Sequence, residues 1–451
     1  MEKRIRKTLF LTGLIIFILT APVLILRSQG FRIDYNQKKL VRTGGIFINP
    51  TTPNVEIYLD EKLKKETGVL SSSAFIKNLL PKTHSIEIKK TGYFSWQKDL
   101  IIKEKEVAEI KDILLIKQNP QFDILLENIE DFFVSEDKKQ ILIKKQTENN
   151  WSLILLDIAT NKYQEIFSTN KLENIIFDVE IKEWDIIENK ILLQEKIQNK
   201  NAFIIIDYSS FPEIEFFSLT PGSNIEKITL NPFNEKEILF LKENRLFTMD
   251  IIQEGNPILF LSDVSWFEIK NKTLFLITPS GFILKIINKN NGKEILNKTP
   301  LIQDVQKEFS VFNFKENLLL NFANKLYKLN KQGTFEEIFS QIKGFKISPD
   351  FEKIVIWKNQ EIWLSEKNNK EYFSFLNRFS KNIKSSFWLD SSHIIFIIDN
   401  EIKISEIDNR DKINIVTFNN FKNPKIFFSE NNKQLYIFSE NTLFISEKLL
   451  P

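Results

Sequence analysis

Short runs of alternating apolar residues follow one another from about residue 120 to the C-terminus, and this pattern restricts the fold more than any other feature. Alternation with a period of two is typical of β-strands that bury one face. A short motif precedes several runs: Val134-Ser135-Glu136-Asp137, Ile347-Ser348-Pro349-Asp350 and Phe428-Ser429-Glu430-Asn431. In all three copies the apolar run begins six residues after the serine. The region is therefore predicted to be all-β and repetitive.

The copies of this motif recur with a period near 40 residues. Asp390, in the looser copy Trp388-Leu389-Asp390, lies 42 residues after Ser348, and Ser429 lies 39 residues after Asp390. Four-stranded propeller blades of the WD type span about 40–45 residues. The motif resembles the S-P-D-G-K turn of WD-type and Tol-associated periplasmic propellers, with Phe351 in the place of its glycine.

Grouping the runs into repeats predicts a β-propeller over residues 120–451. The last repeat has room for only three strands, and Phe122–Glu127 is the candidate for its fourth. That pairing would join the two ends of the region and remove exposed sheet edges. We predict eight blades, with seven as the alternative, and an open β-solenoid is disfavoured because its repeats would be shorter and more regular. The expected blade starts lie near Ile129, Asn174, Ile225, Val264, Phe309, Gly344, Ile383 and Pro424.

An uncharged run near the N-terminus, from Thr8 to Leu26, is long enough to form a transmembrane helix. At about 1.5 Å of rise per residue its length approaches the roughly 30 Å hydrocarbon core of a bilayer. A signal peptide has a shorter apolar region and a cleavage site with small residues, whereas this run ends in Val23-Leu24-Ile25-Leu26. We therefore predict an uncleaved helix, bent at Pro22 in its last turn.

Positive charge lies on both sides of this run. Residues 1–7 form a short basic tail, and the predicted linker over residues 27–43 also carries basic side chains, namely Arg27, Arg32, Lys38, Lys39 and Arg42. The positive-inside rule alone therefore does not decide the orientation. Because a seven-residue tail is easily retained in the cytoplasm, we expect a single-pass protein of the cell membrane with its N-terminus in the cytoplasm and its C-terminal domains extracytoplasmic.

Residues 44–118 are predicted to form a small β-sandwich. Six short runs, separated by turn residues, have strand character: Gly45–Ile48, Val55–Leu59, Phe75–Leu80, Ser85–Lys89, Trp96–Lys103 and Val107–Ile116.

Several residues of this stretch resemble a PEGA domain, a small β-module of extracytoplasmic bacterial and archaeal proteins. They are the strand end with Tyr58 and Asp60, the proline-led turn at Pro81, the corner Gly92-Tyr93 and the following Trp96. The pattern departs from the family at Asn54-Val55, Glu61 and Lys82, where the family has a Gly-Ala pair and two glycines. The resemblance implies binding or spacing at the cell surface and no catalytic residue.

The composition leaves little for catalysis or cofactor binding. Cysteine is absent, and His84 and His393 are the only histidines, so thiolate chemistry is excluded and no metal site or cofactor is expected. The formal net charge of +3 is too small for a nucleic-acid binder. The acids Asp137, Asp350 and Asp390 are predicted to cap turns by accepting backbone N–H bonds. With only 12 glycines, Asn, Lys and Glu are expected at turn positions that favour glycine.

These patterns favour a non-enzymatic, membrane-anchored binding or scaffolding protein of the cell envelope. Its expected partner is a protein or a cell-wall polymer, and its oligomeric state is left open. The alternative is a propeller enzyme that acts on cell-surface polysaccharide through the central channel, with carboxylates or arginines gathered at one mouth. A third reading is a cytoplasmic scaffold of inverted topology. The seven tryptophans are expected mainly in blade cores, with sugar stacking as the other reading.

Overall fold

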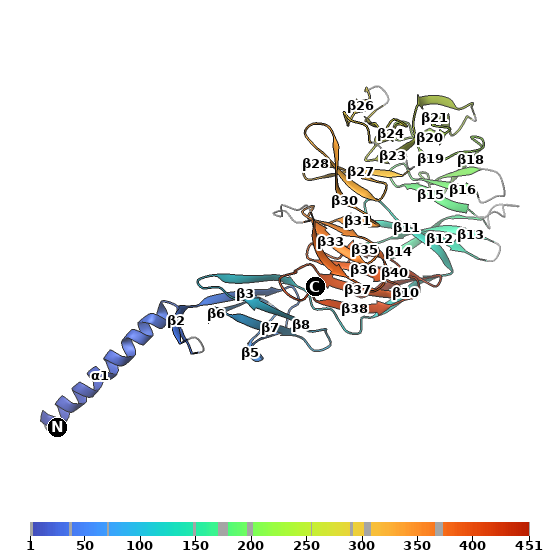
Figure 1. The fold of residues 1–451 in the computed structure, drawn as a ribbon. Helices are drawn as coiled ribbons and strands as arrows, with labels where there is room; N and C mark the ends of the chain where they lie inside the picture. The colour runs from blue at the N-terminus through green and yellow to red at the C-terminus, as the bar shows by residue number, and fades with distance from the viewer. Residues whose placement is uncertain are drawn as a thin grey trace.

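The computed structural model describes residues 3–35, 38–69, 72–147, 150–169, 179–195, 202–253, 255–288, 292–301, 308–365 and 373–450. In these residues one helix is followed by strands alone. Figure 1 shows three parts along the chain: the helix, a small two-sheet domain and a large assembly of sheets that contains the C-terminus. The described part of the chain is therefore all-β apart from its N-terminal helix.

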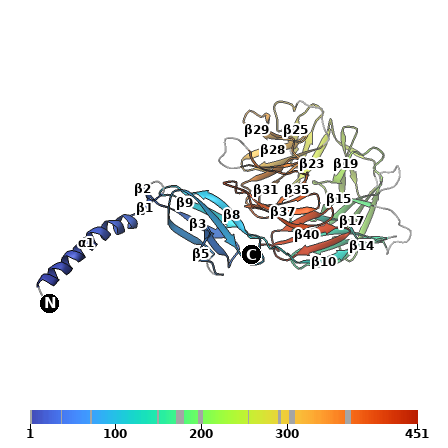
Figure 2. The same ribbon diagram turned by 60° about the horizontal axis from the view of Figure 1, so that its bottom comes forward.

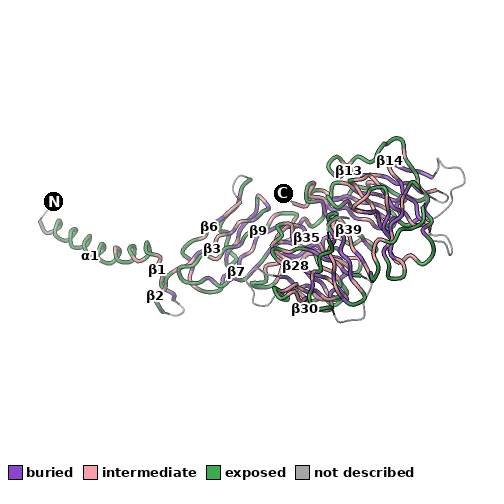
Figure 3. Tube along the Cα trace, turned by 90° about the horizontal axis from the view of Figure 1, so that it is seen from above, coloured by how far each residue is buried: buried purple, intermediate pink, exposed green. Residues whose placement is uncertain are grey.

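The helix α1 (Lys3–Ser28) contains the predicted apolar run from Thr8 to Leu26. Its span Ile5–Ser28 has the length and composition of a membrane span, as a signal sequence also would, and none of its most apolar window is buried against the rest of the chain. Figure 3 shows this exposure along the whole helix. The hydroxyl groups of Thr12 and Thr20 donate hydrogen bonds to backbone carbonyls one turn earlier, which satisfies them within the helix.

The segment predicted as a linker holds a short antiparallel hairpin, made of β1 (Phe31–Asp34) and β2 (Lys39–Arg42). Gly30 precedes it with a φ of 81°, in the left-handed region that favours glycine. The N–H and hydroxyl groups of Thr43 donate to the carbonyl of Gly30 over 2.8 and 2.9 Å and close the base of the hairpin.

The small domain is a sandwich of two sheets. One has the strand order β6-β3-β9, with β3 and β9 parallel, and the other is antiparallel with the order β5-β4-β7-β8. Isoleucines from both sheets, such as Ile46, Ile57 and Ile110, are almost fully buried in one core. The strand bounds are Gly44–Pro50 (β3), Glu56–Leu59 (β4), Lys62–Glu66 (β5), Ala74–Leu79 (β6), Thr83–Lys89 (β7), Trp96–Ile101 (β8) and Val107–Ile113 (β9).

Strand β5 is missing from the sequence-based prediction. Its five residues are all exposed, so they show no apolar alternation. Asp60 and Glu61 both have positive φ, which is the geometry of a type I′ hairpin turn, and they lead β4 directly into β5.

From Phe122 to Ser446 the described residues form eight antiparallel sheets of four strands each. The bounds of β10 to β25 are Phe122–Glu127, Ile129–Val134, Gln140–Gln146, Trp151–Asp157, Lys162–Ser168, Val179–Asp185, Lys190–Glu195, Phe203–Asp207, Glu215–Leu219, Lys227–Leu230, Glu237–Lys242, Arg245–Asp250, Ile258–Ser262, Trp266–Lys270, Thr273–Ile277 and Ile283–Ile286. Those of β26 to β41 are Glu294–Ile295, Phe309–Phe314, Asn317–Phe322, Lys325–Leu329, Phe335–Ser340, Gly344–Ile347, Ile354–Trp357, Glu361–Ser365, Ser374–Arg378, Ile383–Trp388, His393–Ile398, Glu401–Glu406, Ile415–Asn420, Lys425–Ser429, Gln434–Ser439 and Thr442–Ser446.

Each of these sheets shares a buried apolar cluster with the next sheet along the chain. Two further clusters join the last sheet to its predecessor and to the first, so the packing returns to its start. Strand β10 pairs with β41 in the order β10-β41-β40-β39, which is the closure expected for Phe122–Glu127. Figure 2 shows the sheets arranged around a centre. The arrangement resembles a β-propeller, and we call it the ring.

The sheets of the ring begin close to the expected positions. The strands β11, β27, β31 and β35 begin at the residues that the sequence indicated, and β19, β23 and β39 begin one or two residues later. The expected start near Asn174 lies outside the described residues.

Turns of the ring use residues other than glycine, as the composition implied. Both central residues have positive φ in the pairs Glu243-Asn244, Asn271-Lys272, Ala323-Asn324 and Glu440-Asn441, which each join two neighbouring strands. Phe351, in the place of the motif's glycine, also has a positive φ of 56° and is 67% exposed. A bulky residue in this conformation is strained, because its Cβ crowds the following carbonyl.

Candidate functional site

The contact between the sandwich and the ring, which we call the seam, holds a buried ion pair. Lys98 of β8 lies 2.7 Å from Glu406 at the end of β37, and their side chains are 0% and 8% exposed. The Lys98 ammonium also donates to the carbonyls of Asp408 and Lys412 over 2.6 and 3.3 Å. The Glu406 carboxylate accepts further hydrogen bonds from the Trp96 indole N–H and from Asn414. Both buried charges are therefore paired and hydrogen-bonded, as burial of an ion requires.

Polar contacts around this pair extend the seam along the loop between β37 and β38. The Asp99 N–H donates to Asp411 over 2.8 Å, and the Arg410 guanidinium donates to the Glu109 carbonyl over 2.8 Å. Arg410 also forms an ion pair with Asp408 over 2.7 Å. Burial opposes ionisation of Asp408, but the hydrogen bonds from Arg410 prevail and lower its pKa. The loop is thus held in one shape against the sandwich.

Apolar contacts continue the seam where the chain passes from the sandwich into the ring. Leu114 and Ile116 are buried with Leu389, Ile395 and Phe418 in one cluster of the ring. The segment that follows β9 is therefore packed into the core of the ring.

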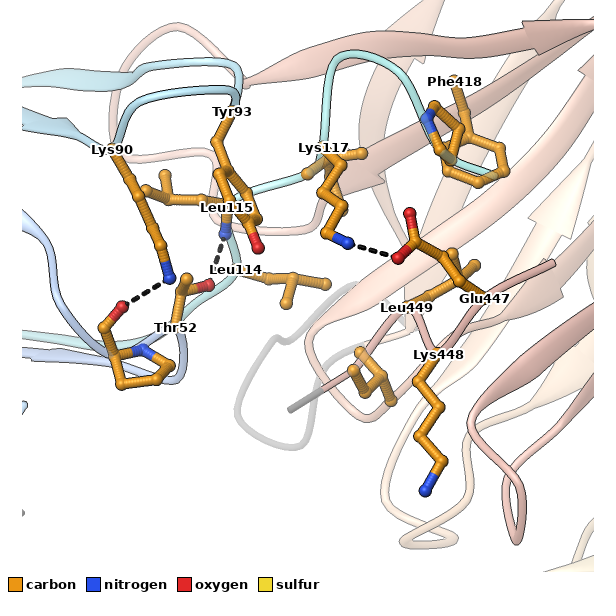
Figure 4. Close-up of a pocket in the computed structure, with 14 residues that line it drawn as sticks. Thr52, Lys90, Tyr93, Leu114, Leu115, Lys117, Phe418, Glu447, Lys448 and Leu449 are labelled. Carbon is orange, nitrogen blue, oxygen red and sulfur yellow. Dashed lines mark hydrogen bonds and ion pairs between the residues drawn. The ribbon is translucent and has the colours of Figure 1, made fainter. Parts of the chain in front are cut away.

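A pocket of about 360 Å³ opens beside these residues and is lined by both domains and by the C-terminal tail. Its apolar wall includes Leu114, Phe418, Leu449 and Leu450. Figure 4 shows the polar side chains that border this wall.

Three lysines and one carboxylate contribute charge to the pocket. The Lys90 ammonium donates to the Pro53 carbonyl over 2.8 Å and lies 4.8 Å from the centre of the Tyr93 ring. Burial, and secondarily the charge of Lys117, lowers the pKa of Lys90. Lys117 is paired with Glu447 (Figure 4), and Lys448 is exposed at the rim. An apolar group with a neighbouring anion would fit this lining.

Residues of the PEGA-like motif divide between the seam and distant turns. Trp96 is buried in the seam, Tyr93 lines the pocket, and Gly92 precedes it with a φ of 80°. Asp60 accepts hydrogen bonds from His84 over 2.8 Å and from the Ser85 N–H over 3.1 Å. Burial raises the pKa of Asp60, but these hydrogen bonds outweigh it and lower the pKa overall. Tyr58 donates to Glu56, and Pro81 precedes β7; neither lines the pocket.

The three turn acids lie in separate sheets and bond their own turns. Asp137 accepts hydrogen bonds from the Ser135 hydroxyl and the Lys139 N–H over 2.7 and 3.1 Å. Asp350 bonds Ser348 and the Glu352 N–H in the same way, and these bonds prevail over burial and lower its pKa to about 2. The structure therefore does not bring these acids together.

Asp390 differs in that it also holds a histidine. It accepts a hydrogen bond from the Ser392 N–H over 2.7 Å and lies 3.0 Å from the Nδ1 atom of His393. His393 is buried, as is His84, and each has an aspartate at its Nδ1 atom. Each histidine thus has a local structural partner.

Carboxylates on the first strands of the sheets bond the neighbouring sheet. Glu183 accepts hydrogen bonds from the Thr229 hydroxyl and the Leu230 N–H over 2.6 and 2.7 Å. Glu268 accepts from the Val311 N–H over 3.0 Å. Burial raises the pKa of Glu183 to about 7 despite its two hydrogen bonds. In the part of the chain that the structure describes, no group of three or more His, Cys, Asp or Glu residues is placed to hold a metal ion.

All seven tryptophans lie in described residues, and none is exposed. Trp96, Trp151, Trp357 and Trp388 are buried, and the other three are partly buried. The core reading of these residues therefore fits the structure better than the sugar-stacking one.

Sequence reasoning missed Lys98 and Glu406, although each breaks an alternation. Lys98 occupies the buried position between Trp96 and Leu100 on β8, and Glu406 follows Ile402 and Ile404 on the buried face of β37. The available signal was a charged residue at a strand position where the alternation calls for an apolar one, because a charged side chain is rarely buried unless it is paired.

Comparison with solved structures finds propellers of low similarity. Sqt1 of Saccharomyces cerevisiae has a TM-score of 0.48 and 9% identity, covering 72% of this chain and 96% of its own. The C-terminal WD40 domain of Sif2 has a TM-score of 0.45 and 11% identity, covering 72% and 98%. The β-propeller domain of Myceliophteria thermophila Cps50 (Swd1) has a TM-score of 0.39 and 11% identity, covering 72% and 99%.

No protein-family model and no curated protein matches the sequence. The resemblance of residues 44–118 to PEGA domains therefore stays a prediction, and the ring is defined by its own strand pairing and packing.

Proposed function

We propose that this protein is a non-enzymatic interaction platform anchored in the cell membrane. In this proposal α1 spans the membrane, the PEGA-like sandwich is a rigid spacer, and the ring is an eight-bladed propeller that presents its loops outside the cytoplasm. The observation that carries the proposal is the buried pair Lys98–Glu406 with its surrounding bonds, because it fixes the ring on the sandwich. A ring held at a fixed place and angle is preorganised, so a partner that contacts both domains would not have to offset the cost of ordering them.

Two features support a closed propeller of eight blades. Eight four-stranded sheets share eight successive apolar clusters, the last of which joins β39–β41 to β11–β13. The first strand of the region, β10, pairs with its last strand, β41, so both ends of the region belong to the same sheet. Closure removes the sheet edges on which an open array would aggregate.

The positions of the acids favour binding over catalysis. Glu183 and Glu268 bond backbone and hydroxyl groups of the adjacent sheet, and the three turn acids bond their own turns. A hydrolase of the propeller channel would need two carboxylates facing each other across open space.

The pocket at the seam supplies the chemistry for a protein partner. Its apolar wall would receive an apolar side chain, and Lys90 and Lys448 would attract a carboxylate next to that side chain. A cell-wall polymer is the alternative partner.

Topology is tested by single cysteines, for which the chain is suited because it has none of its own. Lys3→Cys and Lys331→Cys would be treated with a membrane-impermeant maleimide in intact and in permeabilised cells, and membranes would be washed in alkaline carbonate. We expect retention in the membrane, labelling of position 331 in intact cells, and labelling of position 3 only after permeabilisation. The reverse labelling would establish the cytoplasmic scaffold instead.

Partner binding is tested by crosslinking of the full-length chain in cells, followed by mass spectrometry. Leu449→Asp and Lys448→Glu alter the pocket, and Lys331→Glu is the matched surface control. We expect both pocket variants to lose about tenfold or more of a captured protein that the control retains, as loss of a central contact does at interfaces. Capture that is equal in all variants would place the partner elsewhere, and sedimentation of the wild type with wall polymer tests the alternative.

A further inference from the structure

The hairpin β1–β2 follows α1 after two residues and exposes an apolar face. Ile33 and Leu40 are cross-strand partners, so their side chains lie on the same face, and they are 54% and 50% exposed. Tyr35, directly after β1, is 83% exposed. The two strands contain only eight residues. Exposing three large side chains of this kind to water on so small an element is unfavourable in free energy.

Basic residues lie on both faces of this hairpin: Arg42 pairs with Phe31 on the face of Ile33 and Leu40, whereas Arg32 and Lys39 alternate onto the other face. Arg27, Arg32, Lys38, Lys39 and Arg42 belong to the end of α1 and to the hairpin. The one acid of the two strands, Asp34, is buried, whereas Lys39 and Arg42 are exposed. The hairpin therefore has an apolar face that Arg42 shares, and further basic residues on its other face.

The hairpin lies at the level of the helix end. Strand β1 contacts α1, and Figures 1 and 3 show the hairpin beside the C-terminal end of the helix, away from the ring. Its base is fixed by the bonds of Thr43 to Gly30, and the Lys105 N–H donates to the Thr43 carbonyl, which ties the base to the sandwich. If α1 spans a bilayer, this position is the interface between hydrocarbon and water.

We propose that the β1–β2 hairpin binds the membrane surface, with Ile33, Tyr35 and Leu40 in the interfacial layer and the basic residues against anionic lipid headgroups. Tyrosine is enriched at this depth because its ring is apolar and its hydroxyl polar, and lysine and arginine next to it attract anionic lipids. The proposal rests on the proposed function, since it requires α1 to span the membrane.

This assignment gives the basic residues after the helix a role other than setting orientation. They lie on a folded element that binds headgroups, so positive charge on both sides of α1 is compatible with a single span. Together with the seam, the hairpin would hold the sandwich and the ring at a fixed tilt to the membrane.

The test uses the full-length chain in lipid vesicles, with one introduced cysteine carrying an environment-sensitive fluorophore. Leu40→Cys reports on the hairpin, and Lys331→Cys, exposed on the ring, is the matched control. Vesicles contain phosphatidylcholine with or without phosphatidylglycerol, and lipids with a nitroxide near the headgroup act as quenchers. Carbonate extraction of the same samples reports on the span of α1.

We expect quenching at position 40 to exceed that at position 331 by about twofold or more, as for a residue at interfacial depth. Phosphatidylglycerol should increase the quenching, and neutralising Lys38, Lys39 and Arg42 together to glutamine should remove that increase while the chain stays in the membrane. Equal quenching at both positions in carbonate-resistant samples would overturn the hairpin proposal alone. Release of the chain by carbonate would overturn the proposed span and the hairpin proposal together.

Discussion

Replacing Glu406 by glutamine should loosen the seam more than any other single substitution of similar size. Glu406→Gln leaves the Lys98 ammonium buried at 0% exposure with two carbonyl acceptors and without its ion-pair partner. Removing one partner of a buried ion pair costs about 3–5 kcal/mol, because the remaining charge is uncompensated. A cost of this size shifts the docking equilibrium of sandwich and ring by roughly a hundredfold to several thousandfold.

The assay measures a distance across the seam. Glu104→Cys in the sandwich and Lys331→Cys in the ring are both exposed, and spin labels on them report the distribution of interdomain distances in the full-length chain. We expect a narrow distribution for the parent and a broad one after Glu406→Gln. The exposed pair Lys422–Glu440 provides the control, since Glu440→Gln changes the same chemical group in water and should leave the distribution unchanged.

A double variant separates charge from packing. Lys98→Met combined with Glu406→Gln removes both charges, and replacing both partners of a buried pair is often neutral, so the distribution should narrow again. A distribution for Glu406→Gln as narrow as that of the parent, or no recovery in the double variant, would refute the reasoning from burial of an unpaired charge.

Three further predictions follow from burial, backbone geometry and closure. Glu183→Gln should stabilise the folded chain by about 3 kcal/mol at pH 8 and hardly at pH 4, because the pKa of Glu183 is raised from 4.5 to about 7 and ionisation of its buried carboxyl destabilises the folded state as the pH rises through that window. Urea unfolding at the two pH values measures this effect, and an equal change in stability at both would contradict the prediction. Phe351→Gly should raise the free energy of unfolding by about 0.5–1 kcal/mol through relief of its positive φ, and Phe351→Ala, measured in the same melts, should not. Leu126→Asp, buried in β10, should cost about 3 kcal/mol or more and increase hydrogen exchange in β41, whereas Ile124→Asp, exposed at 57%, should leave exchange in β41 as it is in the parent.

Strand identity was predictable from the sequence wherever at least one face is buried. Ile354–Trp357 and His393–Ile398 are buried on both faces and strongly apolar, so their strand character is visible locally. The exposed strand β5 and the paired strands β1 and β2 were not predicted, because their side chains carry no alternation of burial. These strands are determined by their pairing and by the geometry of their turns, and the hydrophobic periodicity of the sequence contains information on neither.

The candidate site was less accessible to sequence reasoning. Lys98 and Glu406 are more than 300 positions apart, and each has an ordinary explanation as a surface residue when seen alone. Tyr93 and Trp96 were singled out from the family resemblance, and their place at the seam depends on how the two domains dock.

The sequence by itself determined the apolar helix, the all-β character of the rest and the repeat length, because these depend on the period of hydrophobicity along neighbouring residues. The tertiary structure decided that β10 closes the ring on β41, that a buried ion pair joins sandwich and ring, and that Ile33, Tyr35 and Leu40 remain exposed beside the helix. The physical reason is that burial of a charge or exposure of an apolar side chain is a property of long-range packing, which no local pattern contains.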